Sequence, residues 1–165
     1  MNPNPVAHRL PRLPVRHATP WLLLGGVTAA FLDLSFAAIY WTTLHGSSTT
    51  QVLQSIASWV LGANAFTGGS QTAALGAALY AYLMCVLTAL YHAAAGRYPV
   101  LLRRPLACGA AYGMGMYLLI FKFIVPNFTA APAQPPSLTW TLVCVVAYAV
   151  LIGIPCALFT RIARR

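Results

Sequence analysis

The sequence has very little charge, and almost none of that charge is acidic. Charged residues make up 7% of its 165 residues, against roughly 25% in a soluble globular domain. Asp33 is the only acidic residue. A surface so poor in charge is not stable in water, so most of it must face lipid. With a single carboxylate, the chain also has no second acid for a paired general acid and base.

Several kinds of functional site are missing as well. The four histidines lie in the N-terminal tail or near the ends of apolar runs, which disfavours haem ligation at mid-membrane depth. The four cysteines form no CxxC pair and are interpreted as small apolar residues. There is no phosphate loop and no Ser–His–Asp order. The net charge of +9 comes from short basic clusters, not from a basic helix. We therefore predict no cofactor, no metal, no nucleic-acid partner and no conventional active site.

Four apolar stretches are present, and each is long enough to cross a bilayer, which takes about 20 helical residues. They cover residues 21–44, 70–95, 105–125 and 138–160. A cleaved signal peptide is the alternative for the first stretch, but its apolar run continues well past the small residues of VTAAF. The sequence thus predicts an all-α polytopic membrane protein with a four-helix transmembrane bundle over residues 21–160.

The basic residues predict the orientation of these spans. Nine arginines precede the first span, separate the second from the third, or follow the fourth: Arg9, Arg12, Arg16, Arg97, Arg103, Arg104, Arg161, Arg164 and Arg165. The opposite loops, 45–69 and 126–137, contain no charged residue. Positive residues concentrate on the cytoplasmic side. We therefore expect both termini inside, with residues 1–20 as a basic tail and 161–165 as a basic end.

The first outer loop is expected to contain an amphipathic helix over residues 50–62. Its polar face carries Gln51, Gln54, Ser55 and Ser58. Its apolar face carries Val52, Leu53, Ile56 and Val60. Thr49 or Thr50 is suited to cap its start, and Gly62 its end. Such a helix lies in the membrane interface or dips between the spans, either as a lid over the bundle or as a gate for a substrate.

Small residues indicate where helices pack closely. Gly109, Gly113 and Gly115 follow one stripe of the third span, and small residues allow close backbone approach in lipid. This stripe fits packing within the chain and homo-oligomerisation equally well. The expected partners are therefore the lipid bilayer and either a second copy of the chain or another membrane protein.

Asp33 lies in the most apolar part of the first span. It stands eleven residues before Leu44, Tyr80 ten after Ser70, and Tyr148 ten after Leu138. At about 1.5 Å per residue, the carboxyl group and the two phenols lie within ~2 Å of one depth. Lys122 lies ~12 Å nearer the outer edge, so it needs helix tilt to reach Asp33 and otherwise extends to the interface as an outer cation.

An ionised carboxylate at mid-bilayer costs about 2.5–3.5 kcal/mol. We therefore expect Asp33 to be protonated at neutral pH and hydrogen-bonded to Tyr80, Tyr148 or both. Two interpretations remain open. The group is either a proton or cation site oriented by the two tyrosines, or a polar clasp that fixes helix register.

The segments VLQSIASWVLGANAFTGGSQTAALGAALYAYL, YPVLLRRPLACGAAYGMGMYLL and LIGIPCAL resemble a family of small uncharacterised four-span bacterial inner-membrane proteins. The likeness covers roughly residues 25–160 and is most specific in LQSIAS…LG…AF…GG and in RRP. It implies a bacterial inner-membrane location and no established activity. Family members often carry histidine where this chain has Tyr80 and Tyr148, and this departure from the family pattern disfavours a metal or haem site. A looser likeness to small multidrug exporters rests only on one acid in the first of four spans.

Two functions of different classes follow from these observations. The favoured one is a non-catalytic scaffold or accessory subunit of the inner membrane. The alternative is a small proton-linked transporter or channel with Asp33 as its coupling group, and a membrane enzyme with a lipid substrate comes third. A polar cavity that reaches Asp33 from one side would favour transport, whereas a dry, close-packed acid would favour the scaffold.

Overall fold

The computed structural model describes residues 15–132 and 137–164, with side chains from Ala18 onward. These residues form helices joined by short connections, and no strand occurs among them. Four helical stretches are long and apolar enough to cross a membrane: Ala18–His45, Gly69–Arg97, Pro105–Phe128 and Leu138–Ala163. The predicted fold class, an all-α polytopic bundle with an extra helix after the first span, is therefore confirmed.

The first two spans are continuous helices, α1 (Val15–His45) and α3 (Gly69–Arg97). Between them lie α2 (Thr49–Leu61) and the short 3-10 helix η1 (Gly62–Thr67). A single turn of helix, α4 (Val100–Arg103), leads from α3 to the third span.

The third and fourth spans each contain a wider π-helical segment. The third consists of α5 (Pro105–Tyr117), the π segment η2 (Leu118–Ile124) and α6 (Val125–Phe128). The fourth consists of α7 (Leu138–Ala147), the π segment η3 (Tyr148–Gly153) and α8 (Ile154–Ala163). A proline, Pro126 or Pro155, follows each π segment within two residues. Proline lacks a backbone N–H and its ring clashes with the carbonyl four residues before it, which explains why the regular helix is interrupted there.

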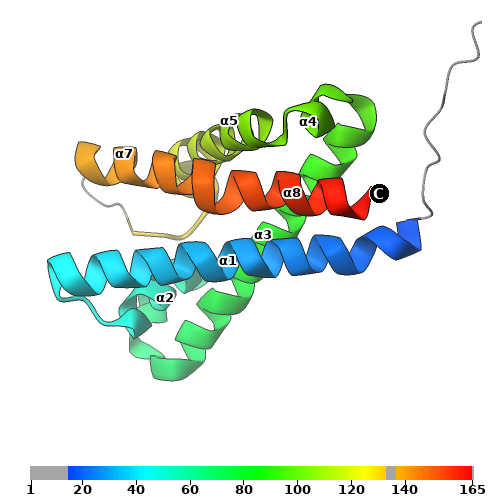
Figure 1. Cartoon of the computed structure of the whole chain (residues 1–165). Helices are drawn as coiled ribbons and strands as arrows, with labels where there is room; N and C mark the ends of the chain where they lie inside the picture. Colours follow the sequence, from blue (N-terminus) through cyan, green and yellow to red (C-terminus); the bar gives the residue numbers. More distant parts are fainter. Residues whose placement is uncertain (1–14, 133–136, 165) are drawn as a thin grey trace, which may run out of the picture.

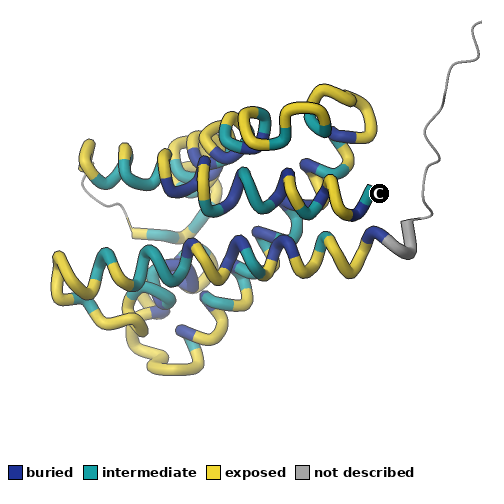
Figure 2. The backbone as a smooth tube through the Cα atoms, in the orientation of Figure 1, coloured by how far each residue is buried: buried dark blue, intermediate teal, exposed yellow. Residues whose placement is uncertain are grey.

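The helices pack around one core (Figure 1). α1 contacts α3 and α8, while α5 contacts η3 and α8. α3 crosses the other long helices steeply, and α2 lies beside its first half (Figure 1). The buried residues lie on the sides of the helices that face one another, and the exposed ones point outward (Figure 2). Many exposed side chains are large and apolar, such as Phe31, Tyr82 and Val146, as a lipid-facing surface requires.

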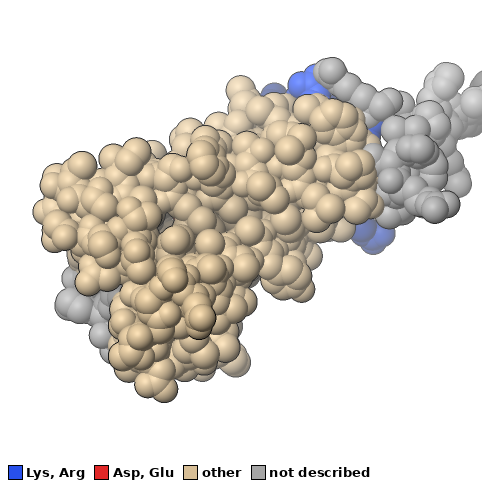
Figure 3. All heavy atoms as spheres, turned by 90° about the horizontal axis from the view of Figure 1, so that it is seen from below, with Lys and Arg blue, Asp and Glu red and all other residues tan. Residues whose placement is uncertain are grey.

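The described arginines lie at one end of the bundle, which we call the arginine end. Arg97, Arg103 and Arg104 lie around α4, and Arg161 and Arg164 lie at the end of α8. The guanidinium of Arg164 donates to the His92 carbonyl oxygen at 2.7 Å, which joins the ends of α8 and α3. The face in Figure 3 shows its Lys and Arg atoms at this end and no acidic atom. Arg9, Arg12 and Arg165 lie outside the described residues, and only the backbone of Arg16 is described.

The opposite end, which we call the uncharged end, contains segments 46–68 and 129–132 and the start of α7. The half of the bundle near the arginine end is closely packed through glycines. A Cβ atom built at Gly153 would lie 2.0 Å from the Gly109 carbonyl oxygen, and one built at Gly26 would lie 2.5 Å from the Cys85 Cα. Only glycine permits such backbone approach.

Candidate functional site

Helix α2 begins with a hydrogen-bonded cap. The hydroxyl of Ser48 accepts from the Gln51 backbone N–H at 3.2 Å, and the Gln51 side chain accepts from the Ser48 backbone N–H at 3.0 Å. The prediction that Thr49 or Thr50 caps this helix is therefore wrong, because Ser48 has the extended backbone that a capping box needs and Gln51 stands three residues after it. Gly62 ends the helix at a φ of 59°.

Helix α2 packs directly against α3. A Cβ at Gly76 would lie 1.9 Å from the Leu53 carbonyl oxygen, so the two backbones touch there. The Gln54 amide donates to the Gly69 carbonyl oxygen at 3.1 Å. Ser58 is only 2% exposed, as buried as Ile56 at 8%, whereas Val60 is 63% exposed. The predicted polar face thus lies partly inside the protein, and α2 forms a wall of the site described next.

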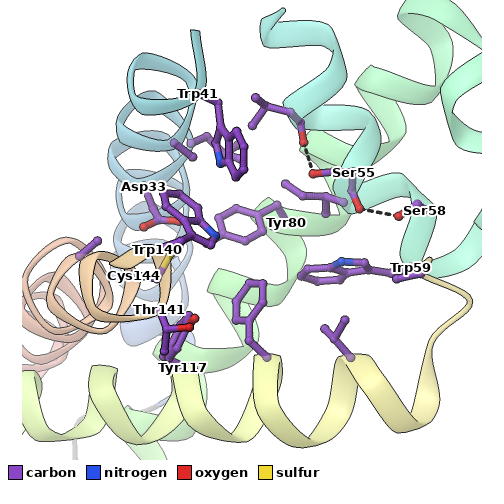
Figure 4. A pocket seen from close by; sticks show the side chains of 18 of the residues that line it. Asp33, Trp41, Ser55, Ser58, Trp59, Tyr80, Tyr117, Trp140, Thr141 and Cys144 are labelled. Atoms are coloured by element: carbon purple, nitrogen blue, oxygen red, sulfur yellow. Dashed lines mark hydrogen bonds between the residues drawn. The ribbon is translucent and has the colours of Figure 1, made fainter. Parts of the chain in front are cut away.

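A cavity of about 760 Å³ extends from the uncharged end into the bundle. Its rim includes Ser47, Pro132 and Ser137 in the connecting segments. Its lining ends in the interior at Asp33 of α1, Tyr80 of α3 and Tyr148 of η3. Figure 4 shows these elements around the hollow, with α2 on the side opposite α7. The size is typical of a small-molecule site, and the mixture of apolar walls with a few polar groups is also typical.

Asp33, Tyr80 and Tyr148 form a hydrogen-bonded chain at the bottom of this cavity. The hydroxyl of Tyr80 donates to the Asp33 carboxylate, and the hydroxyls of Tyr80 and Tyr148 lie 2.9 Å apart. A phenol has one proton to donate, so Tyr148 donates to Tyr80 and reaches Asp33 only through it. Asp33 is 8% exposed and the tyrosines 2% each. The three residues predicted at one depth are therefore in contact, and the acid is at the end of a cavity.

Aromatic side chains make up much of the cavity wall. Trp41 of α1 and Trp140 of α7 lie with their rings 5.1 Å apart on one side (Figure 4). Trp59 of α2 faces Phe121 of η2 at 5.7 Å, and Phe121 in turn contacts Tyr148 at 5.6 Å. Rings thus continue from the rim to the bottom of the cavity.

Two serine hydroxyls of the wall are left as acceptors toward the cavity. Ser55 donates to the Val52 carbonyl oxygen at 2.6 Å and Ser58 to the Ser55 carbonyl oxygen at 2.7 Å, so both hydroxyl protons are used within α2 (Figure 4). Their oxygens can still accept. Lys122 is exposed, and its Nζ donates to Thr141 Oγ1 at 3.2 Å. It lines the cavity nearer the rim than Asp33 does, so the predicted outer cation shares the site without contacting the acid.

The three predicted packing glycines differ in their surroundings. A Cβ at Gly113 would lie 2.1 Å from the Tyr148 carbonyl oxygen, and one at Gly109 would lie 2.6 Å from the Gly153 carbonyl oxygen. Both positions therefore hold the third span against the fourth. No described residue comes within 4 Å of a Cβ at Gly115, which is exposed. The stripe thus serves packing within the chain at two of its three positions.

Sequence reasoning missed the aromatic wall of the cavity. Trp41, Trp59, Trp140 and Phe121 were not among the predicted site residues. A signal was present, because Ala37 and Trp41 stand four and eight residues after Asp33 and thus share its helix face. Likewise, Thr141 and Cys144 stand seven and four residues before Tyr148, and all of these residues line the cavity.

A scan against protein-family models, a search of curated proteins and a search of solved structures each found no match to this chain. The likeness to four-span bacterial inner-membrane proteins therefore stays a prediction, and the function must be inferred from the geometry of the cavity. Among the described residues no group of three or more His, Cys, Asp or Glu side chains is placed to hold a metal ion.

Proposed function

We propose that this chain is a small proton-linked transporter of the bacterial inner membrane, with Asp33 as the coupling group. The observation that supports this most is the cavity that extends from the uncharged end to Asp33. Under the positive-inside rule this end faces outward and the arginine end faces the cytoplasm. The acid is then reached from the outside in the state that the structure represents.

The chemistry needed at Asp33 is the exchange of a proton for another ligand. A protonated carboxyl is neutral and tolerates the apolar surroundings, whereas the ionised form needs a donor or a cation. Tyr80 supplies one donor, and the cavity leaves room for a ligand to supply the rest. Binding of the ligand and release of the proton would then be mutually linked. The π segments η2 and η3 belong to the helices that line the cavity, and π segments occur often at functional sites.

The test is proton movement in vesicles that contain the purified protein and an enclosed pH-sensitive dye. Phenethylammonium, arginine, glucose and acetate are added outside in turn, and at least one is expected to change the internal pH beyond the change in protein-free vesicles, where acetic acid and the free amine cross lipid unaided. Asp33→Asn keeps a hydrogen-bonding side chain but cannot titrate, so it should abolish the change while keeping the melting temperature. Tyr82→Phe, on the exposed face of α3, is the control. Wild-type protein that moves no proton with any of the four compounds would contradict the proposal.

A scaffold or accessory subunit of the inner membrane is the second candidate. It is favoured by a shallow apolar groove of about 490 Å³ on the outward face of the fourth span, lined by Phe36, Leu142, Val146 and Val150 among others. Such a groove suits a helix of another membrane protein. Purification from native membranes with mass spectrometry would detect the partner. For this function Asp33 is a clasp, so Asp33→Asn should keep both fold and partner, whereas Asp33→Leu should loosen the bundle.

A further inference from the structure

We infer that the cavity binds a small organic cation with one positive charge and an aromatic or apolar group, with the charged nitrogen placed at Asp33. The inference rests on the proposed function for the choice of site, but it concerns binding alone and is tested without transport.

The charge at the bottom of the cavity selects the sign of the ligand. Asp33 is the only acidic side chain in the sequence, and it lies where the cavity lining ends. Tyr80 donates to its Oδ2 atom, and Tyr148 donates to Tyr80 rather than to the acid. A cationic nitrogen would complete the coordination of an ionised carboxylate in a place where an uncompensated charge is costly.

The walls favour the same sign. The faces of indole and phenol rings attract cations, and Trp41, Trp140 and Tyr117 line the cavity together with Asp33. The hydroxyls of Ser55 and Ser58 have spent their protons within α2, so they present oxygen lone pairs and not donors. Aromatic rings and acceptor oxygens together suit an ammonium or amine better than an anion or a sugar.

Lys122 limits the charge of the ligand to one. Its ammonium group lies in the cavity lining near the rim, where it donates to Thr141. A second positive charge on a ligand would meet this group with no acid to balance it. A cavity of about 760 Å³ accommodates an amine with one ring and a short linker.

The experiment uses three compounds that share one phenylalkyl skeleton and differ in charge: phenethylammonium, 2-phenylethanol and 3-phenylpropionate. Binding to the full chain in lipid nanodiscs is measured at pH 7 by titration calorimetry. Phenethylammonium should bind about tenfold or more tightly than the alcohol, because only the cation makes a charge-assisted contact with Asp33. The carboxylate should bind most weakly. Equal affinity for the cation and the alcohol, or tightest binding of the carboxylate, would overturn the inference.

Variants locate the site. Asp33→Asn should remove the preference for the cation over the alcohol, and Trp140→Leu should weaken binding of both, while Trp21→Leu, near the other end of α1 and exposed, should change neither. If Asp33→Asn binds the cation as tightly as the wild type does, the cation lies elsewhere and the inference fails.

The wild type alone supplies a second test if Asp33→Asn does not fold. A proton and the cation compete for the same carboxylate, so affinity for phenethylammonium should fall as pH is lowered from 8 to 5, while that for 2-phenylethanol stays constant. The other titratable or charged side chains that line the cavity are Tyr80, Tyr117, Lys122, Cys144 and Tyr148. The rings of His45 and Trp41 lie 4.5 Å apart at a tilt of 40°, so the titration is repeated with His45→Gln. Cation affinity that does not change with pH would contradict the role of Asp33.

The two proposals fail in different ways. Tight, Asp33-dependent binding of the cation without proton movement in vesicles would refute proton-linked transport and leave the binding inference intact. Proton movement driven by a neutral or anionic compound, without cation binding, would do the reverse.

Discussion

The two halves of the bundle differ in what fills the space between α3 and α5. Near the arginine end, Tyr91 of α3 and Tyr112 of α5 meet with their rings 5.1 Å apart, and the Tyr112 hydroxyl donates to the Leu87 carbonyl oxygen at 2.8 Å. Near the uncharged end, the same pair of helices borders the cavity through Tyr80 and Tyr117. One half is thus filled by side chains and the other is open.

This difference indicates that the cavity is a built feature and not a general looseness of packing. Glycines bring backbones together in the closed half, as at Gly153 and Gly26, and Gly76 does the same between α3 and α2 beside the cavity. The open half has a capped helix, α2, as an added wall, and a hydrogen-bonded acid at its end. A bundle that served only to cross the membrane would gain stability by filling this space, since unfilled space forfeits packing contacts.

The largest expected difference between the two ends is in cysteine labelling from outside the cell, which should be complete at one end and absent at the other. In a variant without its native cysteines, Ala63→Cys and Pro132→Cys at the uncharged end should react with a membrane-impermeant maleimide on intact cells, because this end is predicted outside. Tyr98→Cys at the arginine end should react only after the membrane is permeabilised. Labelling of Pro132→Cys only after permeabilisation would overturn the assignment of four spans.

Glycines at close backbone contacts in the closed half should not tolerate added volume. Gly153→Ala places a methyl group 2.0 Å from the Gly109 carbonyl oxygen, and backbone cannot move aside cheaply, so we expect a loss of about 3 kcal/mol or more. Thermal unfolding in detergent, followed by tryptophan fluorescence, measures it. Gly115→Ala is the matched control, since its methyl group meets no described atom and its helix propensity improves. A similar melting temperature for both variants would show that the closed half is not rigid.

In the hydrogen-bonded chain of Asp33, Tyr80 and Tyr148, the residue with two partners should contribute more to stability than the residue with one. Tyr80→Phe leaves both Asp33 and Tyr148 without their partner and should cost about 1–3 kcal/mol, whereas Tyr148→Phe removes only the outer donor and should cost less. Tyr82→Phe, which is 72% exposed in the wild type, should have no effect. The same unfolding assay compares the three variants. A greater loss for Tyr148→Phe would mean that Tyr148 is the direct partner of the acid.

The smallest effect concerns the wall added by α2. Ser48→Ala removes the cap and should destabilise this helix by about 1 kcal/mol. Since α2 lines only the open half, hydrogen exchange should increase at Ser55 and Trp59 and remain unchanged at Thr88 in the closed half. Thr49→Ala provides the control, because Thr49 is exposed and is not the cap. Faster exchange throughout the chain would show that the halves are not separable.

Much of the fold was predictable because lipid leaves the backbone few choices. A run of about 20 apolar residues satisfies its backbone hydrogen bonds in lipid only as a helix, so four such runs predict four spans. The helix after the first span was predictable from its periodic pattern and from Gly62. Which face of this helix turns toward the protein was not predictable. Polar side chains such as Gln54 and Ser58 are expected to face solvent, but in the fold Gln54 donates to the Gly69 carbonyl oxygen and Ser58 donates to a carbonyl oxygen of its own helix.

The residues of the candidate site were predictable one at a time but not as a cavity. Counting residues from the span ends brings Asp33, Tyr80 and Tyr148 to one depth, which is a property of helix rise alone. The distances between the helices and the orientation of Tyr148 in η3 decide two further points. They decide whether Asp33 bonds to one tyrosine or two, and whether side chains fill the space above it. The sequence by itself determined the spans, the isolated acid and the depth of its partners, because these follow from transfer to lipid and from helix geometry. Only the tertiary structure decided that Trp41, Trp59 and Trp140 surround an open space above the acid, because that outcome depends on contacts between residues far apart in the chain.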